Sequence, residues 1–207
     1  MAETRTLCRG GDRGLGRRLT RKRQGGPAIV TADSLRRAAE SYVARFSSSA
    51  EQLRRVLMRR VERSARAHGT DREEGARLAD AIVAKYLDLR LIDDGAFARS
   101  RAAGLFNRGE APGAIRQRLA TQGVGAEDID AALDHLLSET EDAGTYDDLA
   151  AKAAVRFARR SRIGPFRRQP ADADGKRREL ARMARRGFGL EIAKRIVYAE
   201  SEEELER

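Results

Sequence analysis

The chain has 207 residues, and its 42 Lys and Arg against 32 Asp and Glu give a formal net charge of +10. Such a balance favours polyanions, acidic protein surfaces or anionic membranes as partners and says nothing about fold. One cysteine excludes a framework of intrachain disulfides, and no stretch approaches the roughly 18 apolar residues of a membrane span.

The first 31 residues are rich in arginine and glycine and contain almost nothing to bury. This composition predicts a disordered basic arm over residues 1–31, with a transit peptide as the alternative. The N-terminus lacks the apolar core of a secretory signal, and the single Cys8 suggests a reducing compartment. We therefore expect a cytoplasmic protein without membrane contact.

Residues 32–92 are expected to form three helices, because apolar residues recur there at helical spacing and β-branched clusters are missing. The expected helix starts are Asp33 for the first and the capping boxes Ser48–Glu51 and Thr70–Glu73 for the second and third. The expected core residues are Leu35, Ala38, Ala39, Tyr42, Val43, Phe46, Leu53, Val56, Leu57, Val61, Leu78, Ile82, Tyr86 and Leu89.

Residues 93–144 form the second expected unit, which Asp93 opens as a cap. Pro112 suits a first helical position, and Gly123 can take the left-handed conformation that ends a helix. The expected core residues are Phe97, Ile115, Leu119, Ile129, Ala132 and Leu133, with Ile92 and Phe97 spaced as a hydrophobic staple.

Residues 145–200 repeat the plan, with Thr145 as the first cap and a break at Gly164–Pro165. Either Asp172 or Asp174 opens the next helix, Gly187 ends it, and residues 201–207 form an acidic tail. The expected core residues are Leu149, Ala153, Phe157, Leu180, Met183, Ala184, Leu190, Ala193, Ile196 and Val197.

An internal repeat links these units. "LATQGVGAEDIDAAL" from Leu119 and "MARRGFGLEIAKRIV" from Met183 align without gaps, and "LRRVLMRRV" resembles a third, divergent copy. The sequence therefore predicts an all-α fold of three tandem three-helix repeats. One such unit is too small to bury a good core alone, so we expect neighbours to pack end to end in an elongated body.

The central helix pair has the outline of a DNA-reading helix-turn-helix, with Arg116 and Arg118 on its first helix. The second helix, residues 126–138, has no basic residue and carries Glu127, Asp128, Asp130 and Asp134. Phosphates would repel such a helix from a DNA groove. The pair is therefore interpreted as a packing repeat.

The stretch from Ala84 to Leu133, "AKYLDLRLIDDGAFARSRAAGLFNRGEAPGAIRQRLATQGVGAEDIDAAL", resembles the central module of the RecX regulatory proteins. "LARMARRGFGLEIAKRIV" resembles the last module of that family, and the resemblance extends over residues 34–198. The matching positions are Leu91, Ile92, Asp93, Asp94, Phe97, Ala98, Gly109, Pro112, Ile115, Arg116, Leu119 and Gly123.

The resemblance implies a curved, elongated monomer that modulates the bacterial recombinase RecA. Members dock in the groove of the RecA–DNA filament and suppress ATP hydrolysis, strand exchange and coprotease activity, within homologous recombination, DNA repair and the SOS response. Ala96, Gly113 and Ala114 stand where members often carry basic residues. The first module has a longer link than usual and lacks the Gly-Phe turn.

No constellation for catalysis is evident. His68 and His135 have no Cys or His partner at metal spacing. Asp130 and Asp134 lie one helical turn apart and could hold Mg²⁺, but nothing adjacent supplies a general base, so a solvated acidic face is the preferred interpretation. We expect no enzyme activity, no metal and no cofactor.

Arginines on predicted helices and in one loop are the candidate contacts to a RecA–DNA filament, with DNA phosphates as secondary partners. They are Arg54, Arg55, Arg59, Arg116, Arg167, Arg168, Arg177, Arg178, Arg182, Arg185 and Arg186. The alternative is an independent DNA-binding or architectural protein that uses its basic arm and third module. The acidic central module favours the first interpretation, since a pure DNA binder gains nothing from it.

Overall fold

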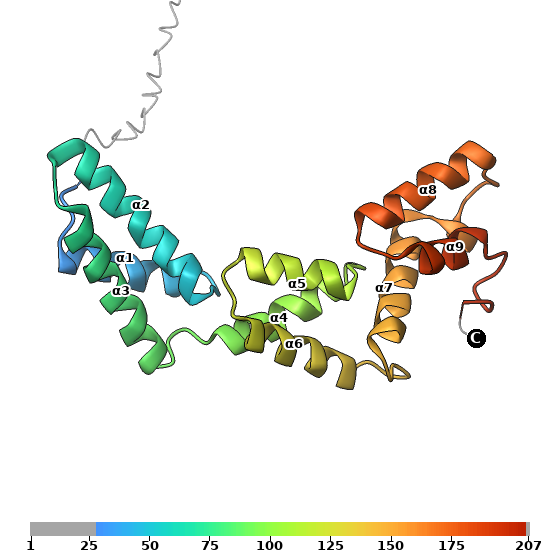
Figure 1. The fold of residues 1–207 in the computed structure, drawn as a ribbon, viewed down its shortest axis with the longest axis horizontal. Coiled ribbons are helices and arrows are strands. Elements are labelled where there is room, and N and C mark those ends of the chain that lie inside the picture. Colours follow the sequence, from blue (N-terminus) through green and yellow to red (C-terminus); the bar gives the residue numbers. More distant parts are fainter. Residues whose placement is uncertain (1–27, 206–207) are drawn as a thin grey trace, which may run out of the picture.

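All regular structure in the computed structural model, which describes residues 28–205, is helical, and this confirms the predicted fold class. Figure 1 shows an elongated, curved body in which the helices follow one another in three groups of three. The groups are α1 (Ala32–Val43), α2 (Ala50–His68) and α3 (Arg72–Asp88); α4 (Asp94–Phe106), α5 (Pro112–Thr121) and α6 (Ala126–Ser138); and α7 (Tyr146–Ser161), α8 (Ala173–Arg185) and α9 (Leu190–Tyr198), with a short 3-10 turn, η1 (Gly164–Phe166), after α7. Most of the arm predicted over residues 1–31 lies outside the described residues. The module boundaries remain a prediction.

Several helix ends follow the predicted residues. Asp93 Oδ1 accepts from Ala96 N at the start of α4, and Thr145 caps α7. Of the two candidates for α8, Asp172 is the cap. Gly123 and Gly187 both have positive φ, at 82° and 87°, just after α5 and α8, so the two halves of the sequence repeat end their helices alike.

Three other helix starts were predicted at the wrong residue. Thr31 rather than Asp33 caps α1, Ser49 rather than Ser48 caps α2, and Asp71 rather than Thr70 caps α3. Adjacent polar residues offer nearly equal start signals, and contacts decide between them. The Ser49 hydroxyl also donates to Gln122 O at 2.6 Å, and the Asp71 carboxylate accepts from two backbone N–H groups.

Buried side chains form two separate clusters. One joins α1, α2 and α3 around Leu35, Leu53 and Leu57, and the other runs without interruption through α4 to α9. Phe46, Leu89 and Leu190 were predicted to be buried but are exposed, because the first two follow the ends of α1 and α3 and the third is the first residue of α9. Ala184 of α8, also expected in the core, is exposed as well. The molecule therefore has one unit of three helices and one continuous unit of six.

The loop between α4 and α5 explains part of that continuity. Gly109 has a φ of +75°, and a Cβ there would lie 2.5 Å from the backbone nitrogen of Phe157 in α7. Only glycine allows this loop to reach the α7 backbone. The second and third groups of helices thus share a close backbone contact as well as apolar side chains.

Candidate functional site

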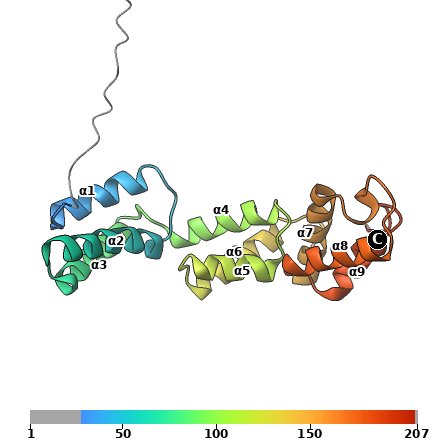
Figure 2. The same cartoon turned by 90° about the horizontal axis from the view of Figure 1, so that it is seen from above.

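The middle helix of each group belongs to one row. At one junction, Ser49 at the start of α2 bonds to Gln122 O at the end of α5, and Arg55 Nη1 donates to Thr121 O at 2.9 Å. At the other junction, Arg186 at the end of α8 lies 3.1 Å from Glu110, just before α5. The order is therefore α8, α5, α2, head to tail. In Figure 1 these helices line the concave side of the body, and Figure 2 shows them along its length.

One group of open cations in this row is on and beside α8. Arg178, Arg182 and Arg185 are exposed and make no ion pair with any residue between 28 and 205. Their spacing of four and three residues places them along one stripe about 10 Å long. Arg168, in the loop before α8, is exposed and equally without an acidic partner among the described residues. Arg177, also exposed, lies 3.3 Å from Asp174.

Arg167 differs from its neighbour and is directed into the protein. Its guanidinium binds both carboxylate oxygens of Glu179, with Nε at 2.8 and 3.0 Å, and its Nη2 donates to Val197 O. Its side chain is only 16% exposed. Arg167 therefore holds η1, α8 and α9 together, and it does not extend the open stripe as the sequence had suggested.

Arg186 forms an ion pair with a buried carboxylate. Glu110 is 4% exposed and binds two arginines, with one oxygen 2.6 Å from Arg118 Nε and the other 3.1 Å from Arg186 Nη1. The Arg186 guanidinium also lies over the Phe157 ring at 5.1 Å. Arg186 therefore connects the end of α8 to the start of α5. Its side chain is still 39% exposed and remains partly accessible to a partner.

Sequence reasoning missed Glu110 and Arg118 as parts of this surface. With Arg185 and Arg186 they line a groove of about 340 Å³ between α5 and α8, together with Ala114, Gln117, Thr121 and Gln122. An acidic residue two positions before a helix-starting proline looks like an ordinary loop residue. Its burial follows from the packing of α8 on α5, for which the sequence carries no local signal.

The candidate arginines of α2 differ in how far contacts within the protein already occupy their guanidinium groups. Arg54 Nε donates to Asp80 Oδ1 of α3 at 2.7 Å, and this hydrogen bond and the nearby negative charge raise the pKa of Arg54. Arg55 binds Glu51 as well as Thr121 O. Arg59 is exposed and its guanidinium meets no acidic side chain in the described part of the chain. Arg59 is thus the most open of the three.

Arg116 of α5 pairs with Asp130 of α6. Helix α6 itself lies on the convex side of the body in Figure 1. Asp134 of the same helix accepts a hydrogen bond of 2.5 Å from Tyr146, and this bond raises the pKa of Tyr146 to about 12. The central acidic helix is therefore used partly in contacts within the protein.

Other kinds of site find no support among residues 28–205. No group of three His, Cys, Asp or Glu side chains there is placed to hold a metal ion. Within the same range, none of the helices has the length and apolar character needed to cross a membrane. The row of α8, α5 and α2 is therefore the candidate functional surface.

Comparisons with known proteins agree with this architecture. Residues 93–133 match the family model described as "RecX, second three-helix domain". A crystal structure of regulatory protein RecX shares the fold, with a TM-score of 0.50 and 24% identity, and the match covers 80% of this chain and 70% of that one.

Curated relatives extend the match over most of the chain. The regulatory protein RecX of Myxococcus xanthus is 37% identical over 172 residues, which are 83% of this chain and 88% of the relative. The protein of the same name from Agrobacterium fabrum is 29% identical over 74% of this chain and 76% of its own length. That of Streptomyces coelicolor is 33% identical over 64% and 65%. This chain therefore belongs to the family of RecX regulatory proteins.

Proposed function

We propose that the protein is a modulator of RecA that docks in the groove of the RecA–DNA filament through the row of α8, α5 and α2 and suppresses ATP hydrolysis, strand exchange and coprotease activity. The observation that carries this proposal is the alignment of the three middle helices along the concave side, with open arginines on two of them. Membership of the RecX family supports the choice of RecA as the partner.

Both signs of charge on the molecule fit a nucleoprotein partner. Arg178, Arg182 and Arg185 can bind phosphates or carboxylates, since the planar guanidinium suits both. Helix α6 carries Glu127 and Asp128 in its first turn. A partner made of protein and DNA offers matching groups for both, whereas bare DNA matches only the arginines.

The test measures RecA ATP hydrolysis on single-stranded DNA with a triple variant, Arg178→Ala, Arg182→Ala, Arg185→Ala. None of the three makes an ion pair within residues 28–205, so the helices should keep their circular dichroism. We expect the concentration needed for half-inhibition to rise at least about tenfold, equivalent to about 1.4 kcal/mol of binding free energy.

The matched control removes three positive charges outside the row, with Arg36→Ala, Arg37→Ala and Arg77→Ala on α1 and α3. It should inhibit like the parent. Equal inhibition by the α8 variant and the parent at every salt concentration would make the third group of helices a scaffold only.

Binding to bare DNA, measured at several salt concentrations, distinguishes docking on the RecA–DNA filament from independent DNA binding. If the α8 arginines touch phosphates, each lost contact should flatten the slope of log affinity against log salt by about 0.7–0.9. If they touch RecA carboxylates, affinity for the filament falls while the slope on bare DNA stays unchanged. Strong binding to bare DNA with no effect on RecA would support the alternative.

A further inference from the structure

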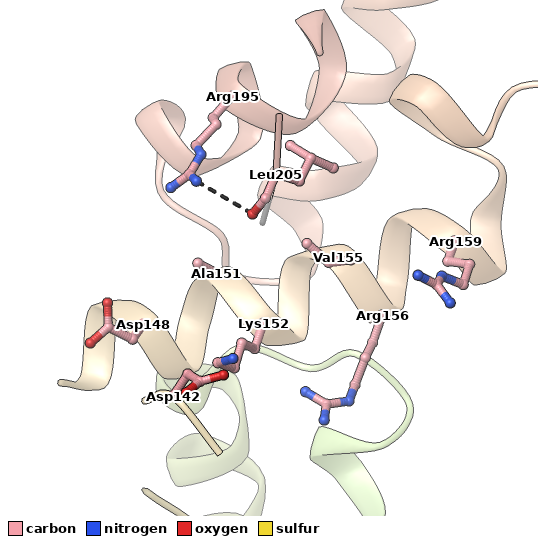
Figure 3. A pocket seen from close by; sticks show the side chains of 9 residues that line it. All are labelled: Asp142, Asp148, Ala151, Lys152, Val155, Arg156, Arg159, Arg195 and Leu205. Carbon is pink, nitrogen blue, oxygen red and sulfur yellow. Dashed lines mark hydrogen bonds between the residues drawn. The ribbon is translucent and has the colours of Figure 1, made fainter. Parts of the chain in front are cut away.

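A second groove lies in the third group of helices, and its lining residues belong to elements other than α8. It has a volume of about 800 Å³ and runs along α7 beside α9 and the chain after α9. Figure 3 shows its walls: Arg159 and Arg195 from the two helices, the apolar side chains of Ala151 and Val155 on α7, and Leu205 opposite them. A cationic rim therefore borders an apolar floor.

The chain itself places an acidic segment in this groove. Residues 199–205, with the sequence AESEEEL, follow α9. The carboxylate of Glu202 pairs with Arg159, and the carbonyl oxygen of Leu205 accepts from Arg195 Nη2 at 3.4 Å. The Leu205 side chain packs against the core cluster of α4 to α9. The groove thus already holds an acidic peptide with one apolar anchor.

This contact leaves the groove underfilled and basic. The volume of about 800 Å³ is what remains with the segment in place, and it is within the range of ligand sites in proteins. Lys152 and Arg156 also line the groove, and Figure 3 shows them pointing away from Arg195 and Leu205; Arg156 lies over the Phe106 ring at 4.2 Å. Asp142 and Asp148 also line it, and the Asp148 carboxylate is occupied by three bonds from Gly144 and Thr145.

We propose that this groove is a docking site for an acidic peptide segment of a partner protein that carries one apolar side chain, and that residues 199–205 occupy it in the absence of that partner. The apolar floor decides between classes of partner. A nucleic-acid backbone would satisfy Arg159 and Arg195 but has no counterpart for the contact that Leu205 makes. An acidic segment with a leucine-like anchor satisfies both.

The test uses an amidated peptide of sequence AESEEEL as the probe and amide NMR shifts of α7 and α9 as the readout. In the full chain carrying Glu202→Ala and Leu205→Ser, the internal segment loses the ion pair with Arg159 and the packing of the Leu205 side chain. Because an internal competitor acts at millimolar effective concentration, we expect the peptide to bind this variant about tenfold more tightly than the parent chain. Adding Arg195→Ala should abolish the gain.

Two controls decide the outcome. Glu203→Ala removes one negative charge from the same segment without touching the groove, and it should leave peptide binding as weak as in the parent. A peptide with serine in place of leucine should bind at least several-fold more weakly. Absence of shifts at millimolar peptide would overturn the proposal, as would equal binding by the serine peptide or by a short oligothymidylate. None of these measurements involves RecA, so their failure would leave the proposed function standing.

Discussion

Single side chains of the same type serve different purposes in this protein, according to the carboxylates within their reach. Arg167 and Arg168 are neighbours in sequence, yet Arg167 is fixed by Glu179 and Val197 O while Arg168 is exposed. Because the segment after η1 has no regular period, the sequence could not tell which of the two faces inward. The open arginines of α8 could be predicted, since a regular helix fixes which residues share a face.

The hydrogen bond between Tyr146 and Asp134 should make the stability of the protein depend on pH. The bond favours the neutral phenol and raises its pKa from 10.0 to about 12. Its stabilising contribution is therefore complete below pH 10 and is lost as the pH rises through about 12. Asp134→Asn should lower the pKa of Tyr146, measured by carbon-13 NMR of its ring carbon bearing the hydroxyl.

The control is Asp147→Asn, which removes an exposed charge beside Tyr146 without touching its hydroxyl. That variant should change the pKa of Tyr146 far less. Equal shifts in both variants would show that general charge, and not the bond between α6 and α7, controls the tyrosine.

Whole helices were predicted more reliably than their ends. The periodicity of apolar residues located every helix from α1 to α9, because burial of one face imposes that pattern. The starts of α1, α2 and α3 were missed by one or two residues, since tertiary contacts such as Ser49 with Gln122 O choose among adjacent caps. The head-to-tail order of α8, α5 and α2 has no local signal at all.

Replacing each of two glycines by alanine, one in α4 and one in the loop after it, should change the stability of the protein in opposite directions. Gly109→Ala should lower the free energy of unfolding by at least about 2 kcal/mol, because φ is +75° and the new Cβ would meet the α7 backbone. Thermal melting and urea unfolding measure the change.

Gly104 within α4 is the matched control, as a Cβ there meets no atom within 4 Å. Gly104→Ala should stabilise the protein by about 0.5–1 kcal/mol through helix propensity. If Gly109→Ala is as stable as the parent, the loop between α4 and α5 is not held against α7.

The two separate cores divide the helices of the molecule into groups of unequal size. Helices α4 to α9 share one cluster, whereas α1 to α3 have their own and meet α4 and α5 through polar contacts such as Asp94 with Ala50 N at 2.8 Å. Apolar burial supplies most of the cooperativity of folding. The two parts should therefore unfold as separate units.

Leu57→Ala tests this division, because Leu57 is 0% exposed in the core of α1 to α3. The substitution should lower the stability of that unit by about 2–5 kcal/mol. Amide hydrogen exchange should accelerate in α1, α2 and α3 and stay unchanged in α5 and α7. Leu133→Ala, in the other core, should give the reverse pattern, and acceleration throughout the molecule in either variant would indicate a single cooperative unit.

The head-to-tail row has a consequence for selectivity that depends on length. Helices of 13, 10 and 19 residues have a combined length of about 60 Å at about 1.5 Å per residue. Weak contacts spread over such a distance reinforce one another when one partner offers them all, since each bound contact raises the effective concentration of the next. A free subunit smaller than the row engages only part of it and dissociates quickly, whereas a polymer of those subunits engages its full length. A protein built in this way can distinguish an assembled polymer from its building blocks by span alone, without a pocket that recognises either.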